Sequence, residues 1–245
     1  MLQPLATAPQ AQDDGARHLQ PLDRFSGSLG QRVYQTLRAA ILSLAYRPGE
    51  ILRKPEICER LGVSRSPVSD AVARLAVEGL VDVLPQAGTF VARFSMDEIR
   101  EGAFLREAIE VAAAERVAQT ITEDQMAQLH RILTVQAALV GGGDFTGFYQ
   151  QDAAMHEAIL SFTGFRRVAQ VSDTAWLHVN RARQLILPLP GRVAQTLEEH
   201  HAIGAALQAR DPAAARLAVR HHLGQLLRLL EPLERDRPDL FTDAR

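Results

Sequence analysis

The pattern of the chain changes near Phe94, and this change constrains the fold more than any other feature of the sequence. Before Phe94, short elements alternate with Gly- and Pro-containing breaks such as "YRPGE", "RLGVS" and "PQAGT". After it, long Ala- and Leu-rich segments with helical spacing are separated by the breaks "TITED", "GGGDF", "FTGF", "LPLPG" and "ARDP". These breaks delimit about six helices, so the second half of the chain predicts an all-α bundle.

The stretch "PEICERLGVSRSPVSDAVARLAVEGLV" predicts a helix-turn-helix. A short helix ends at Gly62, which suits a left-handed helix cap, and Ser64 or Ser66 can cap a second helix with Pro67 in its first turn. The second helix begins with polar and basic residues, as the helix that enters the major groove does. The alternative is a small helical subdomain that binds no ligand.

The segments "LVDVL" and "TFVARF" flank a four-residue turn and predict a β-hairpin, the wing of a winged helix-turn-helix. The predicted fold is mainly α, with an N-terminal winged helix-turn-helix that includes this small β-hairpin and a C-terminal all-α bundle of about six helices. The predicted ranges are a flexible tail at 1–24, the DNA-binding domain at 25–94, the helical domain at 95–236 and a C-terminal tail at 237–245.

Composition indicates a soluble globular protein, with 47% apolar and 23% charged residues and a net charge of -2. Between Ser26 and Phe94, nine Lys and Arg outnumber six Asp and Glu, so a positive surface would be confined to the N-terminal half. The single cysteine, Cys58, fits a reducing cytoplasm. No apolar run reaches the roughly 20 residues of a membrane span, and the N-terminus lacks the pattern of a signal peptide.

The N-terminal half resembles the GntR family of bacterial transcription regulators. The resemblance lies in "VYQTLRAAILSLAYRPGEIL", "ERLGVSRSPV" and "ARLAVEGLVDVLPQAGTFVA". It implies a homodimer that binds double-stranded operator DNA. With the helix-turn-helix reading, it predicts DNA contacts from Arg53, Lys54, Ser64, Arg65, Ser66, Ser69, Arg74, Gln86 and Gly88.

Two positions depart from the family pattern. Ser69 and Asp70 follow the Pro-Val pair where the family often has Arg, and Ala87 stands in the wing where it often has a basic residue. Fewer cationic contacts weaken the sequence-independent attraction to phosphates. We therefore expect fewer contacts with the DNA backbone than is usual in the family.

The stretch "QDAAMHEAIL" places Asp152 and His156 one helical turn apart on one face of a predicted helix. This pair is either a satisfied polar pair in the core or half of a metal site. Further along, Asp211 and Pro212 predict a tight turn between two helices. His200 and His222 each lie eleven residues from Asp211, so they should lie level when the helices fold back on one another.

A second equidistant pair, His201 and His221, flanks the same turn. The apolar spacing places His200 and His222 on the buried faces and turns His201 and His221 toward solvent. Hydrogen-bonded core histidines remain the alternative to a metal site.

The helical half resembles the FCD ligand-binding domain of the FadR-type GntR subgroup. The resemblance lies in "REAIEVAAAERVA", "DAAMHEAIL", "GRVAQTLEEHHAI" and "DPAAARLAVRHHL". It implies a divalent metal ion (Zn, Ni, Co or Mn) held by Asp152, His156, His200 and His222. It also implies a small carboxylate effector bound near Arg106, with Asn180, Arg181 and Arg183 as further candidates; a surface ion pair between Arg106 and Glu110 is the alternative.

These observations predict a metabolite-responsive transcription regulator and not an enzyme. A carboxylate-sensing regulator without a metal is one alternative. A helical metallohydrolase fused to a DNA-binding module is another, although Glu157 is its only candidate general base.

Overall fold

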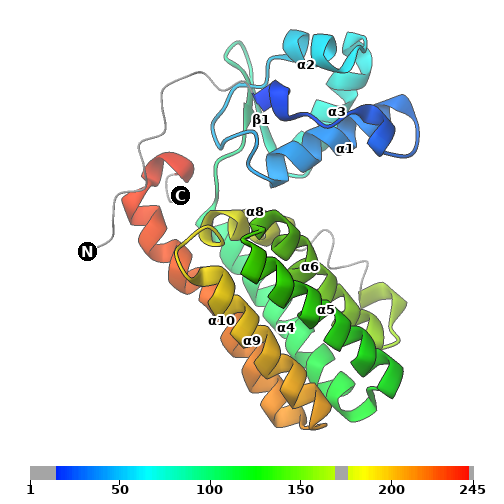
Figure 1. The fold of residues 1–245 in the computed structure, drawn as a ribbon. Coiled ribbons are helices and arrows are strands. Elements are labelled where there is room, and N and C mark those ends of the chain that lie inside the picture. Colours follow the sequence, from blue (N-terminus) through cyan, green and yellow to red (C-terminus); the bar gives the residue numbers. More distant parts are fainter. Residues whose placement is uncertain (1–14, 169–175, 243–245) are drawn as a thin grey trace. The chain divides into compact units, whose positions relative to one another are not determined.

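The computed structural model describes residues 15–168 and 176–242, and the chain divides into two compact units after Arg93 (Figure 1). The predicted fold class is confirmed: a mainly α chain with one small hairpin in its N-terminal unit and a helical C-terminal unit. Among the described helices, none is long and apolar enough to cross a membrane.

The N-terminal unit is built from three helices and the hairpin. Its helices are α1 (Leu29–Leu42), α2 (Lys54–Leu61) and α3 (Arg65–Val77). Apolar residues at helical spacing turn one face of each helix inward, and α1 packs against α3. The fully buried side chains include Val33, Leu37, Ile41, Ile57, Val68 and Leu75.

The turn between α2 and α3 depends on Gly62. This residue ends α2 with φ 64° and ψ 35°, the left-handed conformation that glycine adopts without strain. Ser64 then occupies the N-cap position of α3, and Pro67 lies in its first turn, as predicted, although the Ser64 side chain makes no capping hydrogen bond. The short turn makes α2 and α3 a helix-turn-helix pair.

The hairpin follows α3 directly. Strands β1 (Val81–Leu84) and β2 (Gly88–Val91) are antiparallel, with Val81 opposite Val91 and Leu84 opposite Gly88. The connecting turn is three residues long, one fewer than predicted, because Gly88 belongs to β2. Gln86, at the centre of this turn, has φ 62°.

The α-helices whose bounds are described in the C-terminal unit are α4 (Met96–Thr120), α5 (Glu123–Gly142), α6 (Phe145–Phe162), α8 (Leu177–Ile186), α9 (Arg192–Gln208) and α10 (Pro212–Asp236), and a short 3₁₀ helix, Pro238–Leu240, follows α10. Side chains of Ser95, Thr122, Asp144 and Asp211 cap α4, α5, α6 and α10. Three of the five predicted breaks, "TITED", "GGGDF" and "ARDP", therefore contain a capping residue. The long helices run side by side, and the short α8 contacts α4 and α10 (Figure 1).

An apolar core joins α4, α5, α6, α9 and α10. It includes Val117, Leu129, Met155, Ile203 and Val219, all almost fully buried. Buried polar side chains lie on the same helices, so the packing of this core holds them in place.

Both predicted tails are partly folded against their units. Of the N-terminal range, residues 1–14 lie outside the described part, but Ala16 and Leu19 are buried. At the other end, Phe241 is buried and its ring lies 5.7 Å from that of Phe94. The two ranges are predicted as tails because their composition is largely polar. A few apolar side chains are enough to hold parts of them against the folded units, because burying apolar surface is favourable.

Candidate functional site

Four buried side chains from three helices converge inside the C-terminal unit. Asp152 and His156 come from α6, His200 from α9 and His222 from α10. One ligand atom from each lies within 4.8 Å of the others. His201 and His221, the second pair flanking the Asp211 turn, are exposed.

The Nδ1 atoms of the three histidines face hydrogen-bond acceptors. His156 donates to Glu110 Oε2 at 2.7 Å and His222 to Glu199 Oε2 at 2.7 Å. His200 donates to Gln136 Oε1 at 2.8 Å, and the amide nitrogen of Gln136 is occupied by Gln151, which fixes the orientation of the amide. Each Nδ1 therefore carries the proton, and each Nε2 presents a lone pair.

These lone pairs face one another across short distances. The Nε2 atoms of His156 and His222 are 3.1 Å apart, and His200 Nε2 lies 3.1 Å from Asp152 Oδ1. His200 Nε2 and Asp152 Oδ1 are buried with no hydrogen-bond partner in the described structure. Acceptors that face one another in a buried space repel unless a cation lies among them.

The protonation states agree with this arrangement. Burial lowers the pKa of His200 and of His222 well below 6.5, with further lowering by neighbouring positive groups, so both rings are neutral. Burial alone would raise the pKa of Glu110, but Arg106 and His156 more than offset it and lower the pKa to about 2. The ring nitrogens are therefore free to bind a metal, and Glu110 is ionised to orient His156.

The donor set fits a divalent first-row metal ion. Three imidazole nitrogens and one carboxylate oxygen suit Zn, Ni, Co or Mn. Such an ion holds its ligands at roughly 2.0–2.2 Å, so two ligands of one ion lie at most about 4.4 Å apart. The four ligand atoms lie within 4.8 Å of one another, so the widest spacing exceeds that limit by only a few tenths of an ångström.

Three buried arginines lie beside this group, and each pairs with a carboxylate. Arg106 bonds Glu110 at 2.6 Å, and Arg183 bonds Asp152.

The third arginine, Arg192, bonds Glu199 through two nitrogens at 2.6 and 2.8 Å. The carboxylate of each ion pair therefore contacts or is a predicted metal ligand. Glu110 accepts a hydrogen bond from His156 and Glu199 accepts one from His222, whereas Asp152 is itself a predicted ligand.

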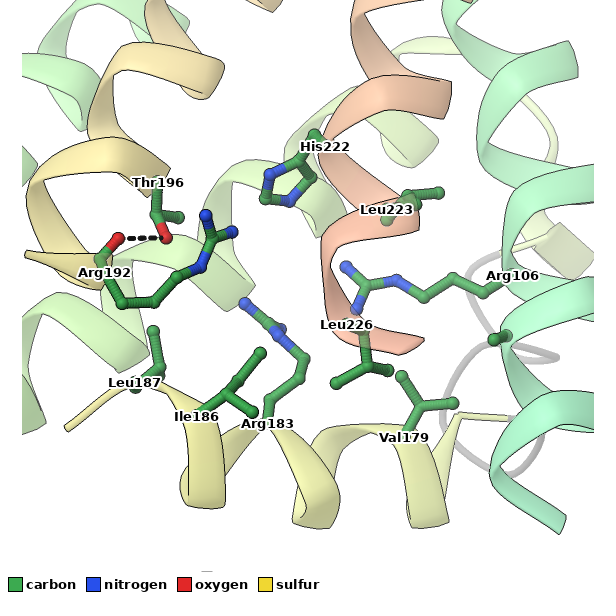
Figure 2. A pocket seen from close by; sticks show the side chains of 11 residues that line it. Arg106, Val179, Arg183, Ile186, Leu187, Arg192, Thr196, His222, Leu223 and Leu226 are labelled. Carbon is green, nitrogen blue, oxygen red and sulfur yellow. Dashed lines mark hydrogen bonds between the residues drawn. The ribbon is translucent and has the colours of Figure 1, made fainter. Parts of the chain in front are cut away.

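The same three arginines line a cavity that also reaches His222 and Thr196. Figure 2 shows their side chains pointing into a common space below His222. The rest of the wall is apolar: Ala103, Val179, Ile186, Leu187, Leu223 and Leu226. We call this space the arginine cavity; the centres of water molecules can occupy about 30 Å³ of it. Burial and the positive charge of Arg106 lower the pKa of Arg183 to about 10, so it stays charged at neutral pH.

A second hollow is also lined by Arg106 and Arg183, together with Ala153 and Glu157. It reaches His156 and is lined by Trp176 and Asn180, with about 100 Å³ open to the centres of water molecules. Asn180, predicted as an effector contact, lies here. Arg181 points elsewhere: it is fully buried with its guanidinium 4.5 Å from the centre of the Phe94 ring.

The predicted DNA contacts cluster at the surface of the N-terminal unit. Ser64, Arg65 and Ser66 are exposed at the N-terminus of α3, and Ser69 follows one turn later. Arg74 is exposed and its guanidinium lies 3.8 Å over the ring of Tyr34.

The remaining predicted contacts lie on other elements. Arg53 forms an exposed ion pair with Glu56 at 3.6 Å, and Lys54 begins α2. Gln86 is exposed at the tip of the hairpin, next to half-buried Gly88.

Family models match both units. Residues 29–91 match the model described as "Bacterial regulatory proteins, gntR family", and residues 101–225 match the FCD domain, which covers half of the chain. The chain belongs to the GntR family. Its members are transcription regulators, so this protein is a DNA-binding transcription regulator and not an enzyme.

Curated relatives agree with this assignment. The HTH-type transcriptional repressor RspR of Escherichia coli K12 is 30% identical over 215 residues, which cover 88% of this chain and 94% of the relative. A putative GntR regulator from Rhodococcus sp. RHA1 has a solved structure with a TM-score of 0.72 and 25% identity, covering 84% of this chain and 99% of the other. The structure of Escherichia coli McbR, at 22% identity and a TM-score of 0.71, shows the same fold.

Sequence reasoning missed the outer layer of the site. The sequence predicts Glu110 only as a partner of Arg106, and it predicts no role for Gln136, Glu199 or Arg192. Glu110 lies four residues after Arg106, which is a readable signal. Gln136 lies on a different helix from His200, and Arg192 begins a helix after a break, so nothing local marks either residue.

Proposed function

We propose that this regulator binds its operator as a homodimer and that a small organic acid controls its operator affinity. The acid would bind beside a divalent ion held by Asp152, His156, His200 and His222. The observation that carries the proposal is the set of four buried acceptor atoms that face one another. Outer partners that fix three histidine tautomers support the same interpretation, since metal-binding histidines usually have them.

The DNA-binding side of the proposal rests on α3. Its exposed N-terminus presents Arg65 between Ser64 and Ser66, and an Arg fork can bind O6 and N7 of guanine in the major groove. Ser69, Arg74, Arg53, Lys54, Gln86 and Gly88 complete the proposed contact surface. In a homodimer, two such surfaces would bind two half-sites of one operator.

We call the four predicted metal ligands, Asp152, His156, His200 and His222, the cage. The effector side of the proposal rests on the arginine cavity, which reaches the cage at His222. A bound divalent ion would supply open coordination positions for a carboxylate. Arg106 would bind the remaining oxygens of the acid, and Asn180 reaches the neighbouring hollow. Arg183, predicted from the sequence as a further candidate, lines the same cavity as Arg106, and we add Arg192, which lines it too. We leave out Arg181, whose guanidinium lies over the Phe94 ring.

Control of operator affinity requires two arrangements of the dimer that differ in their affinity for the acid. An acid that binds one arrangement better shifts the population toward it and so changes the spacing of the two DNA-binding domains. A cytoplasmic location follows from this role, because the operator lies there.

A metal-free carboxylate sensor is the competing proposal. The ion pair between Arg183 and Asp152 favours it, since this pair already neutralises the carboxylate without a metal. In that case, chelator treatment would leave the response to the acid unchanged.

Operator binding tests the proposed function directly. Genomic fragments retained by the wild-type protein are identified first, and Arg65→Ala should lose their retention. Retention is then measured with a panel of organic acids, using protein loaded with Zn²⁺ and protein stripped by a chelator. We expect one or more acids to change retention only when Zn²⁺ is present.

Matched variants separate the cage from its surroundings. His200→Ala should lose the acid response while DNA binding persists, and His201→Ala, one residue away and exposed, should keep it. An acid response that survives in both stripped protein and His200→Ala would favour the metal-free sensor. No acid response under any condition would refute effector control.

A further inference from the structure

The buried ionic groups around the cage form a balanced set. Three arginines and three carboxylates alternate there: Arg106 with Glu110, Arg183 with Asp152, and Arg192 with Glu199. The side chains of all three pairs are at least nine-tenths buried, so water screens their charges weakly. Any charge added to this set must be matched nearby.

A bound divalent ion would unbalance the set. Histidines bind metals in their neutral form, so His156, His200 and His222 contribute no charge. The six charged side chains cancel, and the ion leaves a buried excess of two positive charges. An isolated buried charge is costly, and therefore an anion of charge -2 would be favoured beside the ion.

The arginine cavity is where such an anion can bind. Arg106, Arg183 and Arg192 point into it together, although like charges repel at short range (Figure 2). Arg183 and Arg192 are both buried. The Nε atom of Arg192 has no hydrogen-bond partner in the described structure. The fourth buried arginine of the unit, Arg181, does not line the cavity.

We propose that the effector is a small dicarboxylate, with one carboxylate beside the metal ligands and the other on the arginines of the cavity. This inference rests on the proposed function, because the excess charge arises only with the ion bound. A dicarboxylate restores neutrality, whereas a monocarboxylate leaves one positive charge uncompensated. The limited open space favours a short carbon chain and requires the arginine side chains to move apart.

Matched acids that differ in one charge test the proposal. Binding of malonate, succinate and glutarate to the Zn²⁺-loaded protein is measured by calorimetry and compared with the monoamide of each acid, which has the same length. In the pair that fits best, the diacid should bind at least about tenfold more tightly, because hydrogen bonds between charged groups are the stronger ones.

A charge-removing variant gives a second readout. Arg192→Gln should reduce the advantage of the diacid several-fold, and Arg192→Lys, which keeps the charge, should retain most of it. Arg228→Gln is the matched control, since Arg228 is an exposed arginine on α10 outside the arginine cavity. It should leave the advantage unchanged.

The outcomes separate the inference from the proposed function. Zn²⁺ content is measured in the same preparation, and a protein that binds no Zn²⁺ refutes both. If Zn²⁺ is bound but each monoamide binds as tightly as its diacid, the dicarboxylate inference alone is wrong. If Zn²⁺ is bound and none of the six acids binds, the inference is likewise wrong.

Discussion

The two domains of this regulator bury different kinds of side chain. In the described part of the DNA-binding domain, the buried polar side chains are Thr36 and Thr89, and the rest of the interior is apolar. In its described part, the helical domain buries four arginines, three histidines and the carboxylates of Glu110 and Asp152, and the side chain of Glu199 is only 9% exposed. One domain therefore carries its proposed function on the surface of an apolar core, and the other carries it inside the core.

This difference predicts how each domain responds to mutation. A buried ionic network is costly to disturb, because each removed group leaves its partner buried and unpaired. Exposed contacts on a rigid helix can be removed with little effect on folding. Stability and function should therefore be coupled in the helical domain and separable in the DNA-binding domain.

The largest contrast should come from two aspartates. Asp152→Ala removes a predicted metal ligand and leaves Arg183 without its carboxylate, so we expect a loss of about 3–5 kcal/mol in the free energy of unfolding. Asp70→Ala removes an exposed carboxylate from α3 and should change stability by about 0.5 kcal/mol or less. Denaturant unfolding measures the free energy of unfolding of both variants. Equal losses of stability in the two variants would contradict the contrast between the domains.

The pH dependence of the metal-free protein should be the next largest effect. Because the folded pKa values of His200 and His222 lie below the unfolded value, protons bind more readily to the unfolded chain as pH falls below 6.5. The stability contributed by these neutral rings is present above pH 6.5 and should fall below it, by at most about 3 kcal/mol per pH unit for two groups.

Hydrogen exchange of the stripped protein can locate this loss. Protection should fall on α9 and α10 as the pH is lowered from 7 to 5.5, and less on α1 and α3. Uniform loss of protection across both domains would assign the effect to other groups.

A smaller effect should follow from the outer layer of the cage. Glu199→Gln keeps the shape of the side chain but weakens the acceptor for His222 Nδ1, so metal affinity should fall about 10- to 100-fold. Glu198→Gln, on the neighbouring residue, is the control. Competition with a chromogenic chelator measures both affinities, and an unchanged affinity in Glu199→Gln would show that this carboxylate does not tune the site.

The smallest effect on stability should come from the recognition helix. Arg65→Ala should weaken operator binding by about 1–3 kcal/mol, the range for one bidentate contact with a base. Its melting temperature and metal content should match those of the wild type, because Arg65 is exposed. A fluorescence anisotropy titration measures the affinity, and loss of metal together with DNA binding would contradict the separation of the two functions.

The sequence predicted what depends on local chemistry. Gly62 marks the helix-turn-helix because a left-handed cap suits glycine, and Asp211 marks the turn that sets His200 level with His222. The outer layer depends on which helices pack together, and no local pattern shows that Gln136 on α5 meets His200 on α9.

The arginines of α8 illustrate the same limit. Arg181 and Arg183 are two residues apart, so they point to nearly opposite sides of a helix, and only one of them can line a given cavity. The sequence does not fix the rotation of a short helix. The structure places Arg183 in the arginine cavity and Arg181 over Phe94.

Metal stoichiometry tests the central claim most directly. Protein stripped with a chelator is titrated with Zn²⁺, and the bound ion is counted by elemental analysis after desalting. We predict one ion per chain for the wild type and for His201→Ala and His221→Ala, and none for His200→Ala or His222→Ala. A wild-type protein that retains no ion, or a His200→Ala variant that retains as much as His201→Ala, would contradict the account.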